Sequence, residues 1–316
     1  MKRLMKNEFE GVKPFNDFWF INCYYHQLIA GLSCLGIKKE GILLSRLLMS
    51  GRQFTTLRHE EISDKSGEKY LGYRNRRCNI NEKSLIKHVD CGRPIIAGVD
   101  CFYLESRADT YEKVHAPHFI LVYGYDLVTR EINVVDHDYE NSYLFKKKKI
   151  SLDNLLEANR QYRKKGKKGF FTCRALSKKN QKKCRLIYFT NKEKILLWRK
   201  NSEENLFELK RLFTEDRQNL CDKAFLITEY LEKMRTQFLC VTCLERVKEN
   251  EDFSVTSSEL FQGYSNLLSL FWKMTKQHDF EYAVNHLEAI LRKIDFILER
   301  EKRFFEWFPR CCNEKA

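Results

Sequence analysis

Residues 117–136 read PHFILVYGYDLVTREINVVD, and this stretch decides the fold of the first half of the chain. Residues 118–125 are apolar enough for a buried strand, a polar turn follows, and residues 131–136 form a second stretch of strand length. Two strands joined by a short turn predict an antiparallel hairpin, in which the start of the first strand lies beside the end of the second. We therefore expect His118 and Asp136 to lie side by side.

Helices and one more strand are expected before this hairpin. Apolar residues recur there at intervals of three and four, which is the spacing of one helical face. The expected helices span residues 23–35, 41–49 and 81–89, the last with Asn79 or Asn81 as N-cap, and residues 94–103 are expected to form a buried strand. Helices followed by paired strands predict an α+β domain that ends near residue 190.

The sequence after residue 190 carries only helical patterns. The expected helices span residues 201–214, 220–248, 260–277 and 280–307, and Thr256-Ser-Ser-Glu259 predicts a capping box at the start of the third. Their apolar residues form stripes that can bury against one another. The sequence thus predicts an α+β domain over residues 1–190 and an all-α helical bundle over residues 191–316.

The composition indicates the compartment. The first residues, MKRLMKNEFEGVKPF, contain no apolar run of the kind found in a secretory signal, and no stretch approaches the roughly 18 apolar residues of a membrane helix. We therefore expect a cytoplasmic protein without a membrane segment, in which the 12 cysteines remain thiols. Cys240 and Cys243 form the one CxxC pair, and no second pair of ligands accompanies it, so neither a metal nor a bound cofactor is expected.

Cys23 occupies a position that favours a nucleophile. It opens the first expected helix, and a thiol at a helix N-terminus faces unpaired N–H groups that stabilise its thiolate. His118 can act as the base that pairs with this thiolate, and Asp136 can accept the other imidazole N–H and fix its tautomer. The three residues also follow one another in the chain order of papain. The predicted catalytic residues are therefore Cys23, His118 and Asp136.

Four stretches of the sequence resemble the papain-like superfamily. They are NCYY at 22–25, DCFYL at 100–104, DTYEKVHAPHFILVYGYD at 109–126 and VVD at 134–136. Within the superfamily, the chain is similar to the bacterial leader-peptidase branch and to the N-terminal domain family named for butirosin biosynthesis protein H. The resemblance covers roughly residues 15–160 and implies a papain-like fold for the first domain, with Cys23, His118 and Asp136 as its site residues.

The resemblance also implies an activity. Members of this group resemble acyl or aminoacyl transferases of carrier-protein assembly lines, and amide-forming enzymes of thiotemplated, closthioamide-type antibiotic pathways are similar in kind. The implied reaction moves an acyl group from a carrier-protein thioester to Cys23 and then to a small amine acceptor, in nonribosomal peptide-like biosynthesis. The acyl group would arrive on the phosphopantetheine arm of the carrier protein, and no other cofactor is implied.

One position departs from the papain-like pattern. Papain-like proteases carry a Gln shortly before the cysteine, where its amide donates to the oxyanion, and this chain has Asp17 there. A carboxylate repels an oxyanion, so we expect the oxyanion hole to use the N–H of Cys23 together with Asn16 or Asn22.

The positive charge of the chain is concentrated between Lys146 and Arg185. This span holds 16 Lys or Arg and two acids, and its excess equals the whole net charge of +14. A local basic block suits an acidic partner, and carrier proteins are generally acidic. We expect Lys146, Lys147, Lys148 and Lys149 to bind the carrier protein.

Two other functions remain open on the sequence alone. A cysteine peptidase or thioesterase would use the same three residues, with water as the acceptor. A basic nucleic-acid-binding module would use the basic block together with the aromatic residues among its lysines, namely Tyr162, Phe170, Phe171 and Tyr188. No recognised nucleic-acid motif accompanies these residues.

Overall fold

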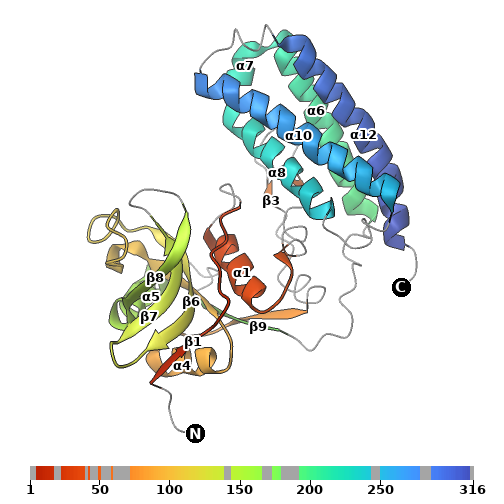
Figure 1. Ribbon diagram of the computed structural model, residues 1–316. Helices are drawn as coiled ribbons and strands as arrows, with labels where there is room; N and C mark the ends of the chain where they lie inside the picture. Colours follow the sequence, from red (N-terminus) through yellow and green to blue (C-terminus); the bar gives the residue numbers. More distant parts are fainter. Residues whose placement is uncertain are drawn as a thin grey trace. The chain divides into compact units, whose positions relative to one another are not determined.

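The computed structural model describes residues 5–17, 23–39, 42, 49–50, 58–59, 72–138, 144–165, 173–178, 192–242, 250–277 and 286–313. The chain divides into two compact units (Figure 1). The first, the sheet unit, comprises Met1–Lys39 and Gly67–Lys183, and the second, the helical unit, comprises Glu40–Ser66 and Cys184–Ala316. The first domain is predicted over residues 1–190, and of the residues described between 40 and 66, Ile42, Met49–Ser50 and Arg58–His59 group with the helical unit.

The sheet unit contains a seven-stranded antiparallel sheet, which gives it the expected α+β character. The strands follow the order β4-β9-β5-β6-β7-β8, and β1 pairs with β6 beside this series. The strands are β1 (Lys6–Glu8), β4 (Tyr73–Arg77), β5 (Ile95–Asp100), β6 (Pro117–Asp126), β7 (Glu131–His137), β8 (Phe145–Ser151) and β9 (Cys173–Lys178). The helical segments described in this unit are α1 (Cys23–Cys34), α4 (Glu82–Asp90), the 3-10 turn η1 (Cys101–Tyr103) and α5 (Leu152–Lys165).

The expected hairpin is present as β6 and β7. Its register pairs Leu121 with Val135. The turn is closed by Asp126, whose side chain accepts hydrogen bonds from two N–H groups of the turn at 3.0 and 3.3 Å. Because antiparallel strands run past each other, this register places the start of β6, where His118 lies, near the end of β7, where Asp136 lies.

Helices cover both faces of the sheet. Successive strand residues point to opposite faces, so Ile120 and Val122 of β6 join the core with residues of α4 and α5, whereas Leu121 lies against α1. At Gly31 of α1, a Cβ atom would come within 3.0 Å of Leu121 and 2.6 Å of Leu176. The absence of a side chain at Gly31 therefore lets α1, and with it Cys23, lie close to the sheet.

Helix α4 uses one of the two caps that the sequence offers. Asn81 Oδ1 accepts a hydrogen bond from the N–H of Ser84 at 2.8 Å, and Ser84 Oγ accepts one from the N–H of Asn81 at 3.1 Å. This reciprocal pair is a capping box. The N-cap is therefore Asn81 and not Asn79.

Strands β4, β8 and β9 and helix α5 are absent from the sequence prediction. Strand β8 contains four successive lysines, and lysine has a low intrinsic preference for strands. Buried Phe145 and Ile150 hold the two ends of this strand, and β8 pairs with β7 along its length. Its conformation thus depends on tertiary pairing, which periodicity does not reveal.

The described residues of the helical unit form helices and a short ribbon of β2 (Met49–Ser50) and β3 (Arg58–His59). Helix α10 packs against α8 and α12, and α12 packs against α6. The helices described are α6 (Lys192–Glu215), α7 (Arg217–Asp222), α8 (Ala224–Thr242), α10 (Glu251–Gln277) and α12 (Leu287–Asn313). The helix expected over residues 41–49 lies mostly outside the described residues, and Met49 itself lies in β2. The helix expected over residues 220–248 is interrupted at Lys223, between α7 and α8.

The start of α10 differs from the sequence prediction. The helix begins at Glu251 because Asn250 caps it, with Asn250 Oδ1 accepting the N–H of Phe253 at 3.1 Å. The capping box predicted at Thr256 is wrong. Thr256 lies inside the helix, where its hydroxyl donates to the carbonyl four residues earlier at 2.8 Å.

A polar cluster lies inside the helical unit. Glu301 Oε1 accepts hydrogen bonds from Ser202 Oγ at 2.8 Å and from the Tyr264 hydroxyl at 2.7 Å, and the Tyr230 hydroxyl lies 3.3 Å from that of Tyr264. All four side chains are buried.

Across the ranges that the structure describes, no helix combines the length and the apolar sequence needed to cross a membrane.

Candidate active site

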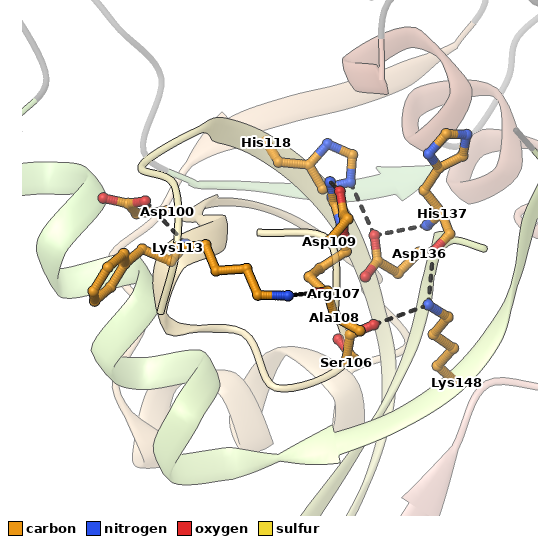
Figure 2. Close-up of polar contacts among 11 residues, drawn as sticks. Asp100, Ser106, Arg107, Ala108, Asp109, Lys113, His118, Asp136, His137 and Lys148 are labelled. Atoms are coloured by element: carbon orange, nitrogen blue, oxygen red, sulfur yellow. Dashed lines mark hydrogen bonds and ion pairs between the residues drawn. The ribbon is translucent and has the colours of Figure 1, made fainter. Parts of the chain in front are cut away.

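The end of the β6–β7 hairpin carries a histidine–carboxylate pair (Figure 2). His118 Nε2 and Asp136 Oδ1 are 2.9 Å apart, and the same oxygen accepts the N–H of His137 at 2.7 Å. The His118 and Asp136 side chains are 7% and 1% exposed. An Nε2–H donated to a buried carboxylate fixes the tautomer of the ring and leaves Nδ1 for a reaction partner.

Cys23 is the partner of His118. It is the first residue of α1, and its thiol and the His118 ring lie near enough that hydrogen bonding and charge between them shift the pKa values of both groups. The main-chain N–H groups of Tyr24 and Phe119 also act on the sulfur. The structure thus brings together three residues that come from α1, β6 and β7 and that the sequence analysis selects as catalytic.

The electrostatics of the three groups favour charge separation. Burial raises the pKa of Cys23, but the hydrogen bond and positive charge of His118 outweigh it and hold this pKa below its ordinary value. Burial lowers the pKa of His118, but hydrogen bonds and charges from Asp136 and Cys23 raise it to about 9. Burial likewise raises the pKa of Asp136, while the His118 hydrogen bond and nearby cations lower it overall. Both shifts favour a thiolate–imidazolium pair over a neutral thiol beside a neutral imidazole.

Cys34, at the other end of α1, shows the effect of the environment. Its thiol donates to the Gly31 carbonyl at 3.0 Å, and burial raises its pKa to about 12. Both cysteines belong to one helix, but only Cys23 has an imidazole beside it and lies at the positive end of the helix dipole. Position and partner together therefore distinguish the two thiols.

Comparison of the sequence with known proteins gives no match. No protein-family model matches the chain, and no curated protein matches it.

One of the two side chains expected in the oxyanion hole has a structural contact. Asn16 Nδ2 donates to the carbonyl of Phe145 at 3.0 Å, and Asn16 Oδ1 accepts the N–H of Phe145 at 2.7 Å. This pairing ties the segment before α1 to β8, and an oxyanion role for Asn16 stays a prediction. Asn22 lies outside the described residues. Asp17 forms an exposed ion pair with Lys39 at 2.7 Å.

The four lysines of β8 that we expect to bind a partner fall into two kinds. Three are exposed, and each contacts a side chain of the sheet unit: Lys146 with Asp138, Lys147 with the ring of Tyr123, and Lys149 with Glu131. Lys148 is partly buried and donates to two main-chain carbonyls. The exposed three present their charge to solvent, whereas Lys148 is engaged within the sheet unit.

Two aromatic residues near the site were not identified as site residues from the sequence. Phe145 stacks over His118, with ring centroids 6.5 Å apart and an interplanar angle of 12°. Tyr162 is buried with its ring 6.0 Å from that of Phe119, and its pKa is raised by burial and then by the charge of Cys23. Both residues reach the site only through tertiary packing, so no sequence spacing marks them. Because Tyr162 is buried, its ring is not exposed for base stacking.

Among the residues that the structure describes, the remaining sequence features add no second site. Phe170, Phe171 and Tyr188 lie outside the described residues, as does Cys243. Cys240 is buried in α8. Among the residues with described positions, no group of three or more His, Cys, Asp or Glu is arranged to hold a metal ion.

Proposed function

We propose that the sheet unit is a papain-like, cysteine-dependent acyltransferase that forms amides. The observation that carries the proposal is the arrangement of Cys23, His118 and Asp136, with a thiol of lowered pKa, an imidazole of raised pKa and a buried carboxylate behind it. Such an arrangement activates a cysteine for attack on an acyl carbon. A nucleophile at the first residue of α1, packed on an antiparallel sheet that carries its base, also supports the papain-like assignment.

In the first half of the proposed reaction, Cys23 is acylated. Its thiolate attacks the carbonyl carbon of a carrier-protein thioester, and the bond between that carbon and the pantetheine sulfur breaks. The departing thiolate takes the proton from His118 Nδ1 and leaves as the carrier thiol. One thioester replaces another, so this step is nearly isoenergetic and needs no ATP.

In the second half, an amine takes the acyl group. The amine nitrogen attacks the acyl carbon, neutral His118 Nδ1 accepts the proton that the nitrogen loses, and the bond to Cys23 sulfur breaks. The products are the amide and the thiolate–imidazolium pair of the resting site. Amide formation from a thioester runs downhill, and Asp136 stabilises the imidazolium each time it forms.

The direct test is the intact mass of the protein after mixing with an acylated carrier protein. We expect the mass to rise by one acyl group, peptide mapping to locate that group on Cys23, and an added amine to remove it as an amide. Cys23→Ala should gain no acyl group. Cys34→Ala, which alters the inert thiol of the same helix, should acylate like the unaltered protein. A protein without acyl gain, or with the acyl group on another cysteine, would contradict the proposal.

The same measurement separates transfer from hydrolysis. A peptidase or thioesterase passes through the same acyl-enzyme, but water removes the acyl group at a rate that does not depend on the amine. If the acyl group leaves as the free acid even with saturating amine, the enzyme is a hydrolase and not a transferase. The role of Cys23 as nucleophile would remain.

The pH dependence of acylation follows from the two shifted groups. Below the lowered pKa of Cys23 the thiol is protonated and unreactive, and above about 9 His118 loses the proton that the leaving thiolate requires. We expect a bell-shaped profile of kcat/KM whose alkaline limb lies near pH 9, with the two limbs belonging to the coupled pair. An alkaline limb near pH 6.5 would show that Asp136 does not support the imidazolium.

A further inference from the structure

Asp136 is a buried carboxylate with only one oxygen in use. Its Oδ1 accepts from His118 and from the N–H of His137, whereas Oδ2 has no hydrogen-bond donor among the described residues. The side chain is 1% exposed. A carboxylate in such a position loses hydrogen bonds to water that the protein does not fully replace. Nearby positive charge is needed to keep it ionised, and a fixed main chain is needed to keep it oriented toward His118.

Lys148 contacts the main chain of two segments, one of which carries this carboxylate (Figure 2). Its Nζ donates to the carbonyl of His137 at 2.6 Å and to the carbonyl of Ser106 at 3.2 Å. His137 directly follows Asp136 on β7, and Ser106 lies on the loop between η1 and β6. One ammonium group therefore joins the strand that carries Asp136 to that loop.

The joined loop also carries a buried cation. Arg107, next to Ser106, is 3% exposed, and its guanidinium binds both oxygens of Asp109 at 3.0 Å. The charges of Arg107 and Lys148 both act on Asp136 in the direction that favours its ionised form. The position of this loop therefore affects the electrostatics of the carboxylate as well as the packing around it.

We propose that Lys148 is a positioning residue for Asp136, which clamps the loop at Ser106 to the end of β7 and so holds the carboxylate against His118. This inference rests on the proposed function, because it assigns Lys148 to the support of the same site. It also separates Lys148 from its exposed neighbours on β8, whose ammonium groups lie on the surface.

The test compares the reactivity of Cys23 in Lys148 variants. Iodoacetamide labelling of Cys23, followed by peptide mapping across pH, gives the apparent pKa of its thiolate. Lys148→Met removes both hydrogen bonds from Nζ to the main chain and one positive charge near Asp136. Asp136 should then stabilise the His118 imidazolium less, and the imidazolium should stabilise the Cys23 thiolate less. We expect this apparent pKa to rise by roughly one unit. Lys148→Arg, which keeps the charge and the donors, should restore most of the shift.

Lys113→Met is the matched control. Lys113 Nζ donates to a carbonyl of the same loop, that of Ala108, at 2.7 Å, but it is exposed and is not among the groups that act most strongly on Asp136. Removal of its ammonium should therefore leave the labelling profile unchanged. If Lys148→Met does not fold, Lys148→Gln keeps two amide hydrogens without the charge and should show the same shift, reduced in size.

The outcomes separate this inference from the proposed function. An ordinary, unshifted thiol in the unaltered protein would overturn the proposed site and the role of Lys148 together. An acid-shifted thiolate that is the same in the unaltered protein, in Lys148→Met and in Lys148→Gln would overturn the role of Lys148 alone. A loss of stability without a change in the profile would also overturn it, because a structural contact alone does not move the thiolate pKa in the folded protein.

Discussion

The sheet unit and the helical unit each bury a carboxyl group, and the two groups respond to burial in opposite ways. Asp136 is 1% exposed and Glu301 is 3% exposed, and each accepts two short hydrogen bonds through one oxygen. Burial raises the pKa of both. The net pKa of Asp136 is nevertheless lowered, whereas that of Glu301 is raised to about 7.

The difference lies in the charge of the partners. His118, Arg107 and Lys148 are cations that stabilise the ionised form of Asp136. The donors to Glu301 are hydroxyl groups of Ser202 and Tyr264, which are neutral, and they reduce the effect of burial without cancelling it. Both shifts make stability depend on pH, but with opposite signs: the lowered pKa of Asp136 favours the folded state at higher pH, and the raised pKa of Glu301 favours it at lower pH.

The largest expected effect comes from removal of the charge of Asp136. Asp136→Asn keeps the size of the side chain but no longer stabilises the imidazolium or fixes the tautomer. We expect the rate of Cys23 acylation to fall by orders of magnitude, about 10⁴-fold by comparison with the triad aspartate of a serine protease. Single-turnover acylation followed by mass spectrometry measures the loss.

Asp138→Asn is the control for this change. Asp138 lies two residues further along and is 21% exposed, and its side chain pairs with Lys146 at 2.7 Å rather than with His118. The variant should acylate at nearly the normal rate. An active Asp136→Asn beside an inactive Asp138→Asn would mean that the other carboxylate orients the base.

A smaller effect is expected from Glu301, and it concerns stability. A group whose folded pKa is raised stabilises the fold fully below its unfolded pKa, here 4.5, and this contribution is lost as pH rises through about 7. The shift corresponds to about 3 kcal/mol of unfolding free energy lost between these limits. Glu301→Gln should remove this dependence, so that the variant loses less stability than the unaltered protein between pH 4.5 and 8. Urea unfolding at several pH values measures it.

Glu299→Gln provides the matched control in the same helix. Glu299 is 60% exposed and pairs with Arg303 at 2.9 Å, so its removal should leave the pH dependence of unfolding unchanged. Equal pH dependence in Glu301→Gln and the unaltered protein would show that the hydroxyl donors compensate for burial completely.

The sequence predicts the hairpin and the helices well where a local pattern dictates the structure. Apolar runs and polar turns mark β6 and β7, and the three- and four-residue spacing marks α1 and the long helices. The sequence does not predict strand β8, because its four lysines show no strand pattern and its conformation depends on pairing with β7. The predicted start of α10 is wrong because the sequence offers two N-cap residues close together, Asn250 and Thr256. The helix uses the earlier one, Asn250.

For the candidate site, the sequence supplies the three polar residues but not their surroundings. Cys23, His118 and Asp136 are identified because each stands at the end of an element that a pattern predicts. Lys148 and Phe145 reach the site through the pairing of β8 with β7, so no spacing relates them to it. The sequence indicates that the four lysines form one surface block, whereas in the structure Lys148 is partly buried and the other three are exposed.

The smallest expected effect concerns those exposed charges, and it extends the comparison from buried to surface groups. If Lys146, Lys147 and Lys149 guide an acidic carrier protein, they act on encounter rather than on bond making. Replacing all three by Glu while keeping Lys148 should raise the KM for the carrier-bound donor several-fold and leave kcat nearly unchanged. Lys146 and Lys149 make exposed ion pairs and Lys147 contacts the ring of Tyr123, so the cost to folding should be small.

A small thioester that lacks the carrier protein separates docking from catalysis in this experiment. Its turnover by the triple variant should match that of the unaltered protein, because no protein surface has to be recognised. Added salt should reproduce the effect of the mutations with the carrier-bound donor, since at physiological ionic strength exposed charges act over only about 8 Å. Equal losses with both donors would mean that the three lysines support the fold of β8. An unchanged KM for the carrier-bound donor would mean that these lysines do not recognise a carrier protein. Small thioesters would then be the acyl donors to test.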